Sequence, residues 1–261
     1  MYMKKIAMLM VIFLFMTLPG FSQKADTIVI DASKIDTRVL IPGTHRYLVY
    51  FKLGKDSSRK MYQLWSRSIA FIQYENKDAV SVTQEWEDND TVVHKTYSVL
   101  NRGDFATLYH ESWWKKTGKT TFDFLKKEAK DRDILLSGKT DSNSIKQEKA
   151  FETACSQYFL NWHLDLEVFP LLPYKDGVTF RINFYDPGFG PPKYVDYTVV
   201  GSRTLPGFNN QKIDCWLLRH GSLPRNQETF WISKQTREVL KLEQEFAGGR
   251  GRYKVKLGFS Y

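Results

Sequence analysis

The five histidines are the side chains of this sequence best suited to metal binding or acid–base chemistry. They are His45, His94, His110, His163 and His220. No two of them stand three or four residues apart, so the sequence lacks the helical spacing of a metal-ligand pair. His94 and His110 fall in neighbouring predicted strands, where isolated histidines are usually structural residues. We therefore predict no metal site and expect no cofactor.

Hydroxyl and thiol nucleophiles are no better placed for catalysis. The sequence has no G-x-S-x-G motif, which would expose a catalytic serine. Cys155 lies among apolar residues, a setting that favours an inert thiol. Two alternatives remain open for Cys155 and Cys215: two buried thiols, or a disulfide, which an exported chain can form. We predict that the protein is not an enzyme.

Two loop motifs resemble binding sites only in composition. The acidic turn EWEDND, residues 85–90, lacks the spacing and the glycine of a calcium loop and is typical of a solvated hairpin tip. The segment DPGFGPP, residues 186–192, lacks the glycine spacing and the following helix of a phosphate-binding loop. We assign ligand binding to neither segment.

Aromatic side chains are the strongest remaining signal, at 15% of the chain. They pack a core, or they line a cavity that holds an apolar ligand, and residue type alone does not separate these alternatives. For a cavity, the predicted ligand-binding residues are Phe151, Phe159, Trp162, Leu166, Phe169, Trp216 and Phe230.

Strands are predicted for most of the chain after residue 23. Short β-branched and aromatic runs, such as HRYLVYFKLG at residues 45–54, alternate with turns rich in Asn, Asp and Gly. This spacing indicates an antiparallel meander, and an open sheet of such length tends to curl. We predict a mainly β fold with a single domain over residues 23–261, built as a highly curved antiparallel sheet or open half-barrel.

One segment changes its apolar period from two to about 3.6. From residue 144 to residue 169, apolar residues recur at steps of four and three, among them Phe151, Cys155, Phe159 and Trp162. Pro170 would end such a helix. We predict one amphipathic helix over residues 144–169, packed on the concave face of the sheet.

The segment ETFWISKQTREVLKLEQEF, residues 228–246, is predicted to be a hairpin rather than a site. Strand alternation places Phe230 and Trp231 on opposite faces of the sheet. The same alternation places Leu240 and Leu242 together on one face of the returning strand.

The N-terminus has the layout of a secretory signal peptide over residues 1–22. Lys4 and Lys5 precede an apolar run from Ile6 to Leu18, and small residues follow. We expect an exported protein of the periplasm or cell envelope, soluble or peripheral. The formal charge of +9 is spread along the chain, which suits a solvated surface or an anionic envelope surface. An exported chain without a basic helix is a poor candidate for nucleic-acid binding.

The C-terminal half resembles a bacterial exported family of unknown function. The shared pattern comprises Phe122-Asp123, Asp176-Gly177, Val200-Gly201, and the strand Trp231-Ile232-Ser233 that returns through Leu240-Lys241-Leu242. That family is similar to the half-barrel of periplasmic lipoprotein carriers, in which a sheet wraps helices around an apolar groove. The resemblance implies the same architecture and supplies no catalytic residues.

Two hypotheses of function follow. The first is a non-enzymatic envelope protein that binds a lipid, an acyl chain or another apolar small molecule between the sheet and the helix. The second is a structural or adaptor module that binds another envelope protein or a glycan. A carrier requires a cavity beneath the helix, whereas an adaptor has a filled core and an exposed patch. The sequence does not determine the oligomeric state.

Overall fold

A single sheet runs through the computed structural model, which describes residues 26–54 and 58–258. Within these residues, sixteen strands pair in the order β1-β11-β12-β13-β14-β15-β16-β2-β3-β4-β5-β6-β7-β8-β9, with β10 also beside β11. β1 and β10 run parallel to β11, and the other described pairs are antiparallel. The predicted signal peptide, residues 1–22, lies outside the described residues.

The strands and helices have the following bounds. The strands are β1 (Thr27–Ile30), β2 (Gly43–Lys52), β3 (Lys60–Tyr74), β4 (Lys77–Asp88), β5 (Thr91–Asn101), β6 (Thr107–Trp114), β7 (Gly118–Asp123), β8 (Glu128–Asp131), β9 (Ile134–Leu135), β10 (Leu160–Asn161), β11 (Thr179–Tyr185), β12 (Lys193–Pro206), β13 (Lys212–Ser222), β14 (Asn226–Ser233), β15 (Val239–Phe246) and β16 (Arg250–Leu257). The α-helices are α1 (Ser142–Cys155) and α2 (Asp165–Val168), and short 3-10 turns include η3 (Leu136–Gly138), η4 (Trp162–Leu164) and η5 (Phe169–Leu171).

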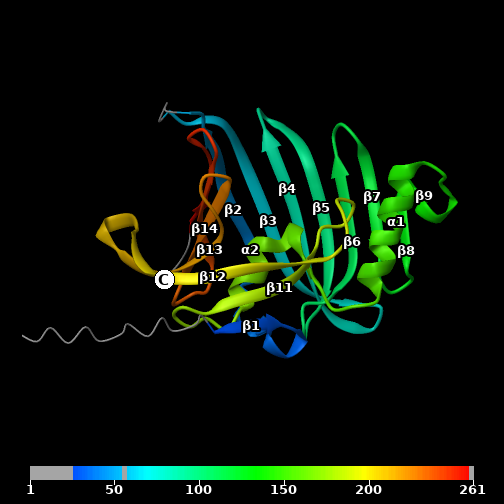
Figure 1. Ribbon diagram of the computed structural model, residues 1–261, viewed down its shortest axis with the longest axis horizontal. Coiled ribbons are helices and arrows are strands. Elements are labelled where there is room, and N and C mark those ends of the chain that lie inside the picture. The colour runs from blue at the N-terminus through cyan, green and yellow to red at the C-terminus, as the bar shows by residue number, and fades with distance from the viewer. Residues whose placement is uncertain (1–25, 55–57, 259–261) are drawn as a thin grey trace, which may run out of the picture.

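The sheet is strongly curved and stays open. Its hydrogen-bonded path ends at β1 and β9, which do not pair with each other. Figure 1 shows β11 and β12 crossing in front of β3 to β6, with α2 enclosed between them, while α1 lies beside β8 at the far edge. The predicted mainly β fold with an open, highly curved antiparallel sheet is confirmed.

The predicted single helix over residues 144–169 is wrong in its extent. α1 ends at Cys155, where the backbone N–H of Ser156 bonds the carbonyls of Thr153 and Ala154. The chain then extends, and Leu160 and Asn161 pair with Phe184 and Tyr185 of β11. Asn161 begins a new turn because its side chain accepts a hydrogen bond from the His163 backbone at 3.0 Å. The apolar spacing continues across this interruption, which is why periodicity alone predicted one helix.

The apolar residues of that segment therefore divide among separate clusters. Phe151 packs with Phe122, Ala129 and Leu136 beneath α1. Phe159 packs with Tyr185 and the α1 alanines. Leu166 and Phe169 belong to the main core, on the concave side of the sheet.

The main core joins α2 and η5 directly to the inner face of the sheet. Val80 and Val82 of β4 and Phe180 of β11 are completely buried against α2 and its flanking turns. Burying each side chain of this size contributes about 1.5–3 kcal/mol. The contact between helix and sheet is thus a packed core.

The β14–β15 hairpin places side chains on both faces of the sheet, as predicted. Phe230 points into the main core, and Trp231 packs on the outer face with Cys215 and Leu240. The register shifts between Trp231 and Ile232, so that Trp231 faces Lys241 while Ile232 faces Val239. This bulge turns Leu240 to the outer face while Leu242 stays in the core, which corrects their predicted placement on one face.

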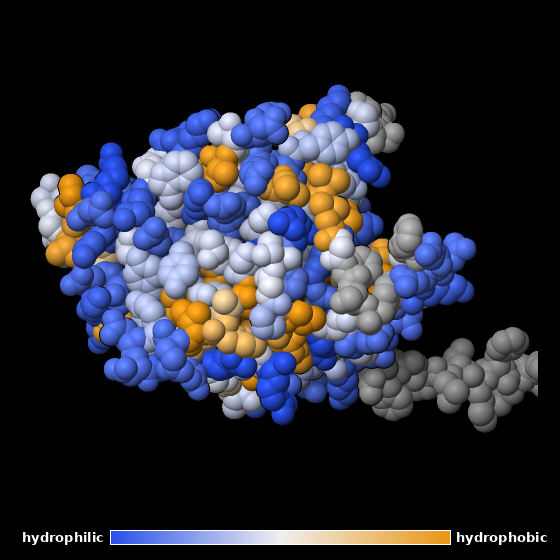
Figure 2. Space-filling model, turned by 180° about the vertical axis from the view of Figure 1, so that it is seen from behind, coloured by the Kyte–Doolittle hydropathy of each residue, from blue (hydrophilic) through white to orange (hydrophobic). Residues whose placement is uncertain are grey.

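The outer surface mixes polar and apolar residues. Figure 2, which views the molecule from behind, shows separate apolar clusters set among hydrophilic side chains. Among the described residues, no helix has both the length and the apolar character needed to cross a membrane.

Candidate functional site

A cavity of about 520 Å³ lies between the inner face of the sheet and the turn that leads into α2. Six aromatic residues line it: Trp65, Trp86, Trp114, Trp162, Phe189 and Phe230. We call it the tryptophan cavity. Its volume falls within the roughly 300–1,000 Å³ that is usual for small-molecule sites.

One wall of the tryptophan cavity is an aromatic ladder across four neighbouring strands. Trp65 of β3 pairs with Trp86 of β4, Trp86 with His94 of β5, and His94 with Trp114 of β6. The Trp65 and Trp86 rings stack with centroids 3.8 Å apart, and those of His94 and Trp114 stack at 3.7 Å. Directly paired residues share one face of a sheet, so strand register brings these rings together. The ladder is not flat, because Trp86 meets Trp114 edge to face, with 90° between the ring planes.

The facing wall comes from the turn before α2 and from β12. Trp162 of η4 stacks on Phe184 with ring centroids 5.3 Å apart. The Lys193 ammonium lies 4.8 Å from the centre of the Trp162 ring. A cation over an indole face is an attractive pair, so Lys193 and Trp162 present a charged and an aromatic surface together.

Arg67, only 1% exposed, fixes the position of η4 and α2 on the sheet. Its guanidinium bonds both carboxylate oxygens of Glu167, at 2.8 and 2.5 Å, and the His163 carbonyl at 2.7 Å. Asp165 lies 3.4 Å from the same guanidinium and 3.0 Å from the ammonium of Lys254. Burial raises the pKa of Asp165, but Lys254 and Arg67 outweigh burial and hold that pKa below its ordinary value. Burial lowers the pKa of Lys254 to about 8.

Charges around the tryptophan cavity balance. Its lining holds three cationic side chains and three carboxyl groups: Arg67, Lys193, Arg252, Asp165, Asp186 and Glu228. Glu228 accepts a hydrogen bond from the Tyr197 hydroxyl at 2.8 Å, and burial raises its pKa. The cavity therefore offers polar partners without a strong net field for an anion or a cation.

Several buried polar atoms of the lining have no protein partner among the described residues. They are Nε1 of Trp86, Nε1 of Trp114, Nε of Arg252 and Oε1 of Gln244. Leaving such a group unpaired typically costs about 1–3 kcal/mol. Three donors and one acceptor thus lie unpaired in side chains of the lining, although each of these atoms is itself covered.

Three histidines meet at this lining, where His163 borders the cavity and His94 and His110 lie outside its lining. The His163 ring lies 4.8 Å from that of His110 and 5.8 Å from that of His94, measured between centroids. His163 Nε2 is 3.0 Å from a carboxylate oxygen of Asp186. Burial lowers the pKa of His94 to about 3 and that of His110 well below its usual range. In the part of the chain that the structure describes, no set of three or more His, Cys, Asp or Glu side chains is placed to hold a metal ion.

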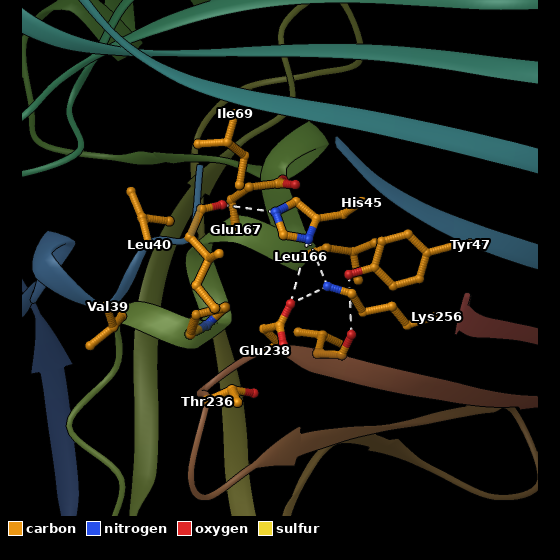
Figure 3. Close-up of a pocket in the computed structure, with 13 residues that line it drawn as sticks. Val39, Leu40, His45, Tyr47, Ile69, Leu166, Glu167, Thr236, Glu238 and Lys256 are labelled. Carbon is orange, nitrogen blue, oxygen red and sulfur yellow. Dashed lines mark hydrogen bonds and ion pairs between the residues drawn. The ribbon is translucent and has the colours of Figure 1, made fainter. Parts of the chain in front are cut away.

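A second hollow, shown in Figure 3, holds about 30 Å³, which is room for a single water at most. Lys256 bonds Glu238 there and donates to His45 Nδ1 at 2.6 Å, while His45 Nε2 lies 2.8 Å from the Ile41 carbonyl. Burial raises the pKa of Glu238, but His45 and Lys256 outweigh it and hold that pKa at about 2. This polar cluster ties β2, β15 and β16 together and has no space for a ligand.

Of the seven ligand-binding residues predicted from sequence, Trp162 and Phe230 line the tryptophan cavity. Phe151 and Phe159 lie beneath α1, and Leu166 and Phe169 are buried in the main core. Trp216 lies at the edge of that core, stacked on Tyr174 with centroids 6.1 Å apart.

Two alternatives were open for Cys155 and Cys215, a disulfide or separate thiols, and in the structure both cysteines are free. Cys215 packs on the outer face of the sheet with Trp231. Cys155 packs against the cluster that α1 covers, so the two thiols belong to different parts of the fold.

Sequence reasoning missed Arg67, Trp65, Trp86 and Trp114 as site residues. A signal was present, because Trp65, Arg67 and Ile69 alternate along one strand and so share a face. An arginine at an inward position of a strand requires a buried partner. This face of the sheet therefore carries polar groups as well as apolar core residues.

A family model and a solved structure match this chain. Residues 46–256 match a family described as "Protein of unknown function (DUF3108)". A solved β-barrel-like protein of the domain of unknown function DUF1849, from Brucella abortus, aligns over 84% of this chain and 98% of its own, at 8% identity and a TM-score of 0.30. That likeness is too low to carry an argument. No curated protein matches the chain.

Proposed function

The chain belongs to the DUF3108 family of proteins of unknown function, and from the geometry of its tryptophan cavity we propose that it binds a saccharide. The observation that carries the proposal is the aromatic ladder Trp65–Trp86–His94–Trp114, whose ring-lined wall adjoins unpaired polar atoms. We place this binding in the cell envelope, because the N-terminus has the composition of a leader for export.

A sugar ring suits both kinds of surface. Its C–H groups form an apolar face that packs on an indole, while its hydroxyls donate and accept hydrogen bonds at the edge. Polar side chains of the lining, among them Asp186, Lys193 and Asn226, supply matching partners. Each net hydrogen bond of this type contributes about 0.5–1.5 kcal/mol. A balanced lining favours a neutral ligand over a strongly charged one.

An acyl chain suits this cavity less well. A purely apolar ligand would cover the charged side chains of the lining, such as Lys193 and Asp186, without bonding them, which carries a desolvation cost. The apolar surface predicted to hold a lipid, around Leu166 and Phe169, is packed against the sheet. Between the two functions expected from sequence, these contacts therefore favour the glycan binder over the lipid carrier.

The test is binding of soluble neutral oligosaccharides to the chain without residues 1–22. A panel of gluco-, manno-, galacto- and N-acetylglucosamine oligomers of about two to six units, a length range chosen to span the cavity, is titrated by isothermal calorimetry. We expect a saturable signal that Trp86→Ala abolishes. Trp216→Phe, outside the cavity lining, is the matched control and should leave affinity unchanged.

Trp86→Phe separates ring stacking from hydrogen bonding, because it keeps an aromatic ring and removes the N–H. We expect affinity to fall by about tenfold, the effect of roughly 1.4 kcal/mol. Saturable binding of fatty acids or phospholipid, with no binding of any oligosaccharide, would overturn the proposal.

A further inference from the structure

A polar hollow of about 290 Å³ adjoins the tryptophan cavity at Trp114. Trp114 and Phe189 line both spaces, so the two are adjacent. The continuation passes Ser112 of β6 and Thr120 of β7 and reaches Asn143 and Gln147 of α1. We call it the α1 extension.

The α1 extension is lined mainly by polar side chains. Hydroxyls of Ser112 and Thr120 and amides of Asn143 and Gln147 line it together with Asp131 and Arg132, whose opposite charges pair at 3.4 Å. Oγ of Ser112 is a buried atom without a protein partner among the described residues, and Ser112 itself is only 2% exposed. This unpaired hydroxyl is an observation independent of the aromatic ladder, and it also points to a ligand with polar groups.

Phe189 stands where the cavity and its extension join. It is 65% exposed, although it is a large apolar side chain. Gly188 and Gly190 flank it with φ values of 91° and 147°, backbone that residues with a side chain rarely adopt. The ring therefore projects from a loop whose shape depends on glycine, and its exposed surface is available to a ligand lying across the junction.

We propose that the site takes a linear oligosaccharide, with one end on the tryptophan ladder and the other along the α1 extension, and that Phe189 contacts the unit at the junction. This inference rests on the proposed function. From β4 to β8 the path crosses four strand spacings, which is about 19 Å at ~4.8 Å per strand. A ligand of one or two sugar rings would occupy only the cavity.

The experiment compares ligand length rather than ligand identity. Any oligosaccharide series that binds in the calorimetric panel is titrated from dimer to hexamer. We expect affinity to rise by about tenfold or more along the series, since additional hydrogen bonds contribute to binding. The double variant Asn143→Ala/Gln147→Ala should remove that gain while leaving dimer affinity unchanged.

Matched variants control for effects on the fold. Glu148→Ala, on α1 but outside the extension lining, should behave as wild type for every length. Phe189→Ser, in the loop, should weaken hexamer binding more than dimer binding, and it tests the junction without touching α1. Circular dichroism confirms that each variant keeps its strand and helix content.

Two failures are distinguishable. If no oligosaccharide of any length binds, the proposed function itself fails, and the inference with it. If dimer and hexamer bind with equal affinity, or if the α1 and Phe189 variants leave the length dependence intact, the cavity binds sugar but the extended site is wrong.

Discussion

Trp65 and Trp86 lie face to face with ring centroids 3.8 Å apart and an angle of 3° between their planes. The pair is set by strand register, because the two residues are direct partners across β3 and β4. Trp65 is buried, whereas Trp86 is half-buried at the cavity. The stack thus joins the core to the candidate site.

Replacing Trp86 should separate stability from binding. We expect Trp86→Ala to lower the free energy of unfolding by about 2–3 kcal/mol, toward the low end for large aromatic residues because the ring is only half-buried. Trp86→Phe should lower it by about 1 kcal/mol. Urea denaturation monitored by circular dichroism measures both, and an equal loss for the two variants would contradict a stabilising role for the indole stack.

The buried charge cluster around Arg67 should be sensitive to the loss of a single partner. Arg67→Met leaves the carboxylates of Glu167 and Asp165 without their guanidinium, and we expect a loss of about 3–5 kcal/mol in unfolding free energy. Removing both charges of the closest pair, in Arg67→Met/Glu167→Gln, should recover part of that loss. Chemical denaturation of the three proteins tests this.

A surface pair provides the comparison for that prediction. Arg181 and Asp196 also form a two-bond contact, at 2.8 and 2.7 Å, but both side chains are nearly half exposed. Arg181→Met should change the unfolding free energy far less than Arg67→Met does, because an exposed pair contributes little to stability. Equal effects at Arg67 and Arg181 would show that burial of the Arg67 cluster has no energetic consequence.

The strands and their antiparallel pairing with sequence neighbours were largely predictable, because alternation and turn residues are local signals, whereas the pairings of β1 with β11 and of β16 with β2 were not. Phe230 and Trp231 illustrate this, since period-two alternation alone placed them on opposite faces. Leu240 shows the limit. One inserted residue in the β14–β15 register reverses the faces beyond it, and nothing in the local pattern of residues 239–246 marks that bulge.

The candidate site was mostly unpredictable for a related reason. The aromatic ladder depends on which residues of β3, β4, β5 and β6 stand opposite one another, and register across four strands is a non-local property. The helix prediction failed because α1 ends at Cys155 and Leu160 pairs with Phe184 of β11 instead of continuing the helix. Apolar periodicity records that a residue is buried, but not against which element.

Two buried histidines should make the fold sensitive to mild acid. Burial lowers the pKa of His94 to about 3 and that of His110 well below its usual range, whereas both take up protons near pH 6.5 when unfolded. Below that pH the unfolded chain binds more protons than the folded one, so stability falls as pH falls. Each group contributes a slope of up to about 1.4 kcal/mol per pH unit.

Carboxyl groups determine the pH range in which the histidine contribution can be measured. Carboxyls with lowered pKa values, such as Asp165 and Glu238, add acid sensitivity only below about pH 4.5. Glu228, whose pKa is raised by burial, acts in the opposite sense. Glu228 is common to the wild type and a histidine variant, so the difference between their unfolding free energies from pH 7.5 to pH 5 isolates the histidine contribution. His94→Gln should flatten the slope there, and an unchanged slope would contradict the assignment.

Cys155 and Cys215 should remain separate thiols that differ in access. Burial raises the pKa of Cys215 to about 11, and the residue is completely buried, so its reactive thiolate is scarce at neutral pH. Burial also raises the pKa of Cys155, but that residue is only partly covered. Alkylation of the native protein without reductant, read by mass spectrometry, should label Cys155 slowly and Cys215 hardly at all.

Denaturation without reductant should expose both thiols to label, because no bond joins them. The contrary result is a protein, purified under oxidising conditions, that takes no label after denaturation and two labels once it is reduced. That result would show that the thiols pair. It would also show that the two sides of the fold approach more closely than the structure places them.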